Sequence, residues 1–260
     1  MCKIYKSSAM QIFFIFIATL TVPAVLKSQD GLFDLNKLTD FGTKQYKMTL
    51  IDRRSGKPVE VERGTMVLAA AHTKDSISLK NTTRMYLPDG KRFIEYQADC
   101  IFSKQDEKMN LRSLNYKITR SDKVVLVDIK AKIENGKITQ TILEADEKSK
   151  EEKNWTDGTY PDLAVFFLIP QLSQKKGKSY EIDHVMTLPF SPDTKATARK
   201  ITCLGIDKDL KIDGQEVTRF VNKADGEETG IVYWVDSKGR LLRVQLNPEN
   251  RLDLITKKND

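Results

Sequence analysis

Polar and apolar residues alternate along most of the chain from about residue 44. Between Ile94 and Phe102 every second residue is apolar, and Glu95, Gln97 and Asp99 lie between them. The same pattern runs from 125 to 133. Such alternation predicts antiparallel strands that bury one face and leave the other in water. In the C-terminal half, strands are expected at 180–188, 196–206, 215–222, 230–235 and 241–246.

Short turn sequences separate these segments. Asn135-Gly136, between Ile133 and Ile138, is the strongest hairpin signal, since both residue types accept a positive φ. The segment 207–214 has some features of a calcium-binding loop, but Lys211 stands where an oxygen ligand is needed. We therefore expect a hairpin turn at 213–214 rather than a metal site.

One apolar block, residues 161–172, interrupts the alternation. Pro161 suits the first turn of a helix, Asp162 places a negative charge near its N-terminus, and Pro170 ends it. A buried strand is the alternative, because the block is also rich in residues that favour strands. The candidate core or ligand-cavity residues, which would surround a helix rather than form a stripe, are Leu163, Val165, Phe166, Phe167, Leu168 and Ile169. The expected fold is mainly β: a curved antiparallel sheet or incomplete β-barrel with one short capping helix around 161–172.

Residues 144–154 contain no apolar residue larger than alanine. This composition is typical of a loop or a short solvated helix. Neither flanking half has enough elements to fold alone, so we expect a single domain, 29–260, with a charged excursion at 144–154.

The first 28 residues have the order of a signal peptide. Lys3 and Lys6 precede an apolar run at 12–20, which is followed by small residues. An uncleaved membrane anchor is the alternative, but the run is shorter than the ~20 residues of a spanning helix and Pro23 interrupts it. We expect a secreted or periplasmic protein that begins between 25 and 29, with peripheral association with the envelope as one option.

Charge gives no support for nucleic-acid binding. Removing Lys3, Lys6 and Lys27 with the leader lowers the net charge from 43 − 36 = +7 to 40 − 36 = +4. The remaining basic residues are spread along the chain and mixed with acidic ones.

Cys100 and Cys203 could form a disulfide, but two buried thiols are favoured because Cys100 lies on an inward row of a strand.

The residues that usually carry catalysis are sparse. Only His72 and His184 are present, and Asp183 beside His184 would point to the opposite face of a strand. No Gly-x-Ser-x-Gly motif marks a nucleophile. We therefore expect no enzymatic activity, no metal site and no cofactor.

Three segments of the C-terminal half, 162–169, 177–182 and 233–244, resemble a family of bacterial envelope proteins of unknown function. That family is similar in architecture to the periplasmic lipoprotein carriers, in which a curved antiparallel sheet and helices enclose an apolar cavity. Phe166 and Phe167 stand where the family has tyrosines, and the carriers' own signature residues are not evident. The resemblance therefore implies the architecture and an envelope location, but not lipoprotein trafficking.

Two functions follow from this shape. The first is binding of an apolar ligand, such as an acyl chain or a lipid, between the sheet and the 161–172 block. The second is a structural or protein-interaction role with a filled interior, for which the bulky candidates are Trp155, Phe166, Phe167, Phe190 and Trp234. A hydrolase comes third. The interior volume distinguishes the first two, and the sequence does not determine the oligomeric state.

Overall fold

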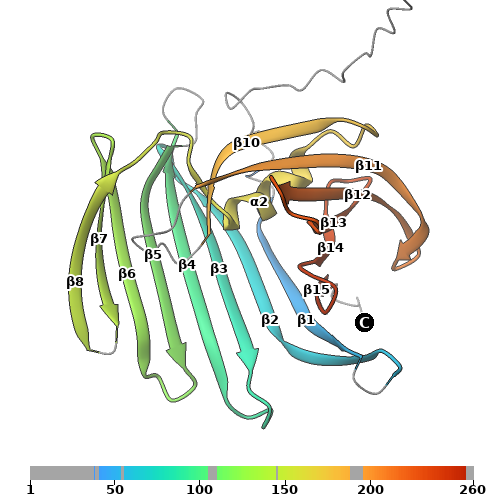
Figure 1. Cartoon of the computed structure of the whole chain (residues 1–260), viewed down its shortest axis with the longest axis horizontal. Helices are drawn as coiled ribbons and strands as arrows, with labels where there is room; N and C mark the ends of the chain where they lie inside the picture. The colour runs from blue at the N-terminus through green and yellow to red at the C-terminus, as the bar shows by residue number, and fades with distance from the viewer. Residues whose placement is uncertain are drawn as a thin grey trace, which may run out of the picture.

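The computed structural model describes residues 38, 41–53, 56–104, 110–144, 146–187 and 196–255. The predicted leader, 1–28, lies outside these residues. All the described strands belong to one sheet of 15 strands (Figure 1). They are β1 (Thr43–Asp52), β2 (Val59–His72), β3 (Ser76–Tyr86), β4 (Phe93–Ser103), β5 (Asn110–Arg120), β6 (Val125–Glu134), β7 (Lys137–Glu144), β8 (Glu147–Asn154), β9 (Tyr160–Pro161), β10 (Ser179–Met186), β11 (Thr197–Ile212), β12 (Gln215–Ala224), β13 (Ile231–Asp236), β14 (Leu241–Gln245) and β15 (Asn250–Leu254).

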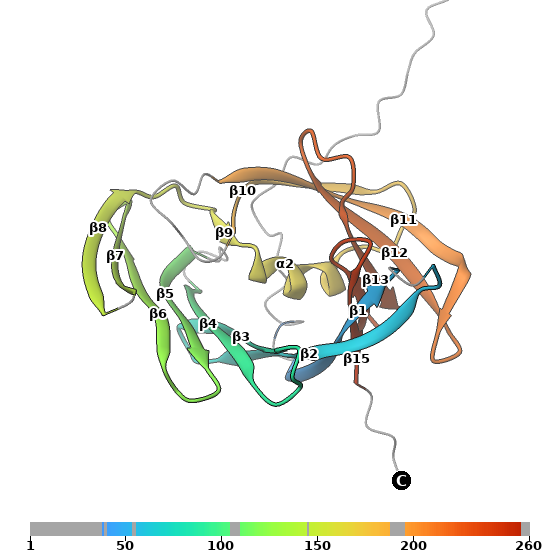
Figure 2. The same ribbon diagram turned by 60° about the horizontal axis from the view of Figure 1, so that its bottom comes forward.

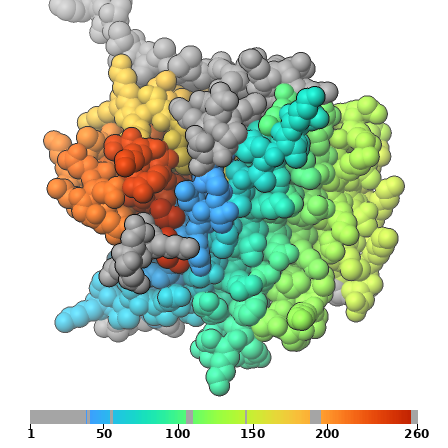
Figure 3. Space-filling model, turned by 180° about the vertical axis from the view of Figure 1, so that it is seen from behind, coloured from blue at the N-terminus to red at the C-terminus, as the bar shows by residue number. Residues whose placement is uncertain are grey.

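Two antiparallel meanders, β1 to β8 and β10 to β15, meet where the first strand pairs with the last. β1 pairs with β15 from Tyr46 opposite Leu254 to Leu50 opposite Asn250. Figure 3 shows β1 and β15 side by side on the surface, next to the broad face formed by β2 to β8. The sheet curls without closing, because β8 and the short β9 form its two edges (Figure 2). The fold is therefore mainly β, a curved open sheet, as the sequence predicts.

The hairpin predicted at Asn135-Gly136 is confirmed. Both residues have positive φ, 51° and 69°, and the hairpin pairs Glu134 with Lys137. Asp213 and Gly214 also have positive φ, 49° and 74°, between β11 and β12. The second turn confirms that 213–214 closes a hairpin.

The sequence suggested a loop or a short helix for the charged segment 144–154, and this prediction is wrong. Residues 147–154 form β8, an edge strand that pairs with β7 along its whole length. Its side chains are mostly exposed, and Lys137 on β7 binds Glu152 at 2.6 Å. A strand that buries neither face needs no apolar alternation, which explains the wrong prediction. Its Lys and Glu side chains also oppose edge-to-edge association.

The inward rows of the sheet form the core. On β4, Ala98, Cys100 and Phe102 are buried, whereas Gln97 is exposed. Cys100 and Cys203 are free buried thiols, as favoured from the sequence, and burial raises the pKa of both.

The apolar block forms a helix, so the buried-strand alternative is wrong. α2 (Leu163–Leu168) continues into the 3₁₀ helix η2 (Ile169–Gln171). Asp162 caps α2, because its Oδ1 accepts a hydrogen bond of 2.8 Å from the Leu163 backbone N–H. Pro161 lies in β9, opposite Met186 on β10, and not in the first helical turn. Figure 2 shows α2 inside the curve of the sheet.

In the part of the chain that the structure describes, no helix is long and apolar enough to cross a membrane.

Candidate functional site

The six predicted cavity residues come together on the α2 segment, but they are packed by other side chains. Exposed fractions are 4% for Leu163, 2% for Val165 and 0% for Leu168 and Ile169. These four side chains keep almost no accessible surface, so the interior directly around them is filled.

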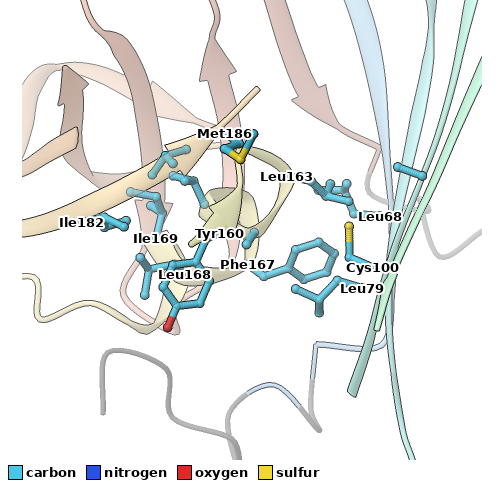
Figure 4. Packing of buried hydrophobic residues seen from close by; sticks show 14 of the residues in the cluster. Leu68, Leu79, Cys100, Tyr160, Leu163, Phe167, Leu168, Ile169, Ile182 and Met186 are labelled. Atoms are coloured by element: carbon cyan, nitrogen blue, oxygen red, sulfur yellow. The ribbon is translucent and has the colours of Figure 1, made fainter. Parts of the chain in front are cut away.

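The two phenylalanines of the block differ. Phe167 is fully buried, and its ring centroid lies 4.5 Å from that of Phe41. Figure 4 shows Leu163 and Phe167 on the side of α2 that faces Leu68, Leu79 and Cys100. Phe166 is only half-buried, contrary to the expectation that it belongs fully to the core.

Phe166 contacts the next layer of the sheet on β13. Its ring meets that of Tyr233 edge-on, with centroids 5.9 Å apart. Burial raises the pKa of the Tyr233 phenol, which therefore stays neutral. A hollow of about 260 Å³ adjoins the end of the block, and Phe167, Pro170 and Gln171 line it together with residues of β1 and of the segment 238–241.

The two tryptophans do not both fill the interior. Trp155 is buried in the main core, and its backbone N–H donates to the Gly136 carbonyl at 2.8 Å. Trp234 instead belongs to a second apolar cluster with Ile212, Val217 and Leu242. Its Nε1 donates to Asp207 at 2.8 Å. Phe190 lies outside the described residues.

Among the described residues, no three His, Cys, Asp or Glu side chains lie close enough together to hold a metal ion. His72 ends β2, opposite Ile77, and His184 lies on β10 beside the exposed Asp183. The structure thus leaves the two histidines on separate elements.

A larger hollow of about 610 Å³ lies on the other face of β11, β12 and β13; we call it the outer groove. Cys203, Phe220 and Tyr233 face the core, so the residues that alternate with them face outward. The groove is lined by aliphatic Leu204, Val221, Val232 and Pro248, by polar Thr202, Thr229, Gln245 and Asn247, by charged Lys200, Arg219, Lys223 and Glu228, and by Gly230.

Two local irregularities shape the outer groove. The pairing of β11 with β12 passes from Cys203 opposite Phe220 to Gly205 opposite Arg219, so Leu204 is an extra residue in a bulge. A bulge redirects a side chain, and Leu204 is 41% exposed at the groove. At the rim, a Cβ added to Gly230 would lie 2.5 Å from the Asn222 carbonyl oxygen. The close approach of this turn to β12 therefore requires glycine.

The charges of the outer groove are not balanced. The lining holds three cations, Lys200, Arg219 and Lys223, and one carboxylate, that of Glu228, while Glu181 on β10 lies opposite Lys200. Lys223 Nζ donates to the backbone oxygen of Glu228 at 2.7 Å, not to its carboxylate. Among the described residues, the Arg219 Nε is enclosed by protein and has no hydrogen-bond partner. The lining of the outer groove therefore combines aliphatic side chains with an excess of positive charge.

The groove was not predicted from the sequence, because its basic residues are spread along the chain among acidic ones. A signal did exist: Leu204, Val221 and Val232 are apolar at positions where the alternation calls for polar residues. Apolar side chains on the outer face of adjacent strands mark a covered or ligand-binding surface.

No protein-family model matches the chain, and no curated protein matches it in sequence. Among solved structures, the chain is similar to a β-barrel-like protein of the domain of unknown function DUF1849 from Brucella abortus. That match has 15% identity and a TM-score of 0.48, and covers 82% of this chain and 95% of the other. It is also similar to a DUF1089 family protein from Pseudomonas aeruginosa, at 15% identity and a TM-score of 0.39, over 71% of this chain and 90% of the other. Neither name states a role for the protein that bears it.

Proposed function

We propose that this protein is an exported, non-enzymatic binding protein that holds a ligand with a hydrocarbon chain in the outer groove. The supporting observation is the volume of about 610 Å³ above the aliphatic side chains of Leu204, Val221 and Val232. Ligand pockets typically enclose about 300–1,000 Å³ and are mostly apolar. Each methylene group buried there contributes about 0.8 kcal/mol.

This proposal moves the ligand from the interior to the outer face. The α2 segment was the expected site, but its side chains are buried against protein on almost every side. In this proposal the filled interior is the scaffold that holds β11 to β13 in position. The export signal at 1–28 supports a location in the periplasm or outside the cell.

A long-chain fatty alcohol is a suitable probe, because it offers a hydrocarbon chain without charge. Saturable binding to the purified, delipidated protein is expected in a fluorescence-displacement titration. Val221→Trp should abolish it by filling the groove, whereas Val67→Trp should not. Val67 is a matched control, since it is also a half-buried valine on the outer face of a strand, β2.

Absence of saturable binding in folded protein would refute the proposed ligand and favour a structural or protein-interaction role. Equal binding by the parent protein and Val221→Trp would place the ligand elsewhere. Export is tested separately: amino-terminal sequencing of protein released from the cell should find a start between residues 25 and 29, and a start at Met1 would contradict it.

A further inference from the structure

We propose that the ligand of the outer groove carries an anionic group, most simply a carboxylate, at each of its two ends. This inference rests on the proposed function, because it specifies the ligand of the same groove. Arg219 would bind one carboxylate, the pair Lys200 and Lys223 would bind the other, and the aliphatic residues between them would hold the chain.

The first supporting observation is a pair of like charges. Lys200 on β11 lies directly opposite Lys223 on β12. Like charges in this position destabilise an antiparallel pair. On β3 and β4, by contrast, opposite charges face each other: Lys80 faces Asp99, with 3.3 Å between Nζ and Oδ2, and Arg84 faces Glu95. The pair Lys200 and Lys223 therefore differs from these two pairs, although Glu181 on β10 lies opposite Lys200 on its other side.

The second observation is the unsatisfied Arg219. Its Nε is buried, and no acceptor among the described residues reaches it. A buried donor without a partner is costly, and a guanidinium binds a carboxylate through two parallel hydrogen bonds. The Nε itself has no accessible surface, so a ligand carboxylate would bind the guanidinium where Arg219 lines the groove.

The spacing of the cations gives the length of the ligand. Arg219 and Lys223 are four residues apart on β12, which is about 13 Å at ~3.3 Å per residue. Between them the row of Thr202, Val221, Val232 and Gln245 crosses the groove, each opposite the next. An apolar centre with a cation at either end matches a linear chain with two anionic ends about 13 Å apart.

The test compares three linear probes of similar length: a dicarboxylate whose ends span about 13 Å, the monocarboxylate and the diol. Affinity for the purified protein should decrease in that order, by about tenfold at each step, which corresponds to about 1.4 kcal/mol. Arg219→Gln and Lys200→Met should each lower affinity for the dicarboxylate by about tenfold, without changing affinity for the diol. Lys130→Met is the matched control, since Lys130 is an exposed lysine on the outer face of β6.

Equal affinities for the dicarboxylate and the monocarboxylate would overturn the two-ended ligand. Equal affinities for all three probes would show that charge plays no part, while leaving the proposed chain-binding function intact. If none of the three linear probes binds but the long-chain fatty alcohol does, the two anionic ends are refuted and the proposed chain-binding function stands. If neither binds, the proposed function fails as well. Raising the salt concentration should weaken dicarboxylate binding more than diol binding.

Discussion

Replacing Phe167 with alanine is expected to remove a large part of the stability of this fold. Phe167 is 0% exposed and packs against Phe41, so its loss leaves a cavity in the core between α2 and the sheet. A Phe→Ala change in a core costs about 3–5 kcal/mol. The total free energy of unfolding of a domain is about 5–15 kcal/mol. The variant should therefore remain folded only with a small margin.

The matched control is Phe166→Ala on the same helix. Phe166 is half-buried and keeps one edge contact, with Tyr233. Its loss should cost about 1–2 kcal/mol, because part of its ring already faces water. Lys148→Asp on the exposed edge strand β8 should change stability by less than about 0.5 kcal/mol.

Urea unfolding followed by tryptophan fluorescence measures the difference. With a slope of about 2–3 kcal/mol per molar urea, the midpoint should fall by about 1–2.5 M for Phe167→Ala and by about 0.3–1 M for Phe166→Ala. Equal shifts for the two variants would refute the burial difference. A shift below about 0.5 M for Phe167→Ala would refute the filled interior itself.

Three further predictions concern buried thiols, a glycine in close contact with a neighbouring strand, and a carboxylate with a lowered pKa. Cys100 and Cys203 are 0% exposed, so a thiol reagent should label them only after denaturation; rapid labelling of the folded protein would contradict their burial. Gly64→Ala should lower the urea midpoint sharply, because the added Cβ would lie 1.8 Å from the Arg84 carbonyl oxygen. An unchanged midpoint would show that β2 and β3 can separate at this position. Hydrogen bonds from Arg92 lower the pKa of Asp89 to about 2, so its contribution to stability is present above pH ~4 and lost as pH falls toward ~2. Asp89→Asn should flatten the stability profile in that window, and an identical profile would refute this assignment.

Local pattern was sufficient for much of the fold. The inward row of β4 and the turn at Asn135-Gly136 were predicted because period-two alternation and positive-φ residues leave a direct signature. The helix at 163–168 was harder to predict, since its apolar composition fits a strand as well. The sequence evidence for a helix was Pro161, the negative charge of Asp162 and Pro170; Asp162 does cap the helix, whereas Pro161 lies in β9.

Other elements depend on contacts between distant residues. β8 has no apolar face, and β15 is only five residues long, so neither has a periodic signal. β15 is held by its position, because it pairs with β1 on one side and β14 on the other. Arg251 also reaches across β1 to β2, where its guanidinium donates to both carboxylate oxygens of Glu60 at 2.8 Å. The pairing of β15 with β1 joins segments about 200 residues apart, so only the three-dimensional structure reveals it.

The outer groove depends on register in the same way. The opposition of Lys200 and Lys223 follows from how β11 pairs with β12, and the bulge at Leu204 sets which side chains face Arg219. In the sequence these residues are simply basic or aliphatic positions on different strands. A one-residue slip would turn them into the core, so no local pattern can assign them to one site.

The strands that carry the groove are packed on both of their faces. Tyr233 of β13 meets Phe166 of α2 on the inner side, while the next residue, Trp234, is buried in the second apolar cluster on the outer side. A ligand in the outer groove therefore meets a surface already fixed by packing, which lowers the entropy cost of binding. A ligand between the sheet and α2 would instead displace side chains such as Phe167, at a cost of several kcal/mol. On these energies the outer face suits the proposed ligand better than the interior does, and α2 supports the strands beneath it.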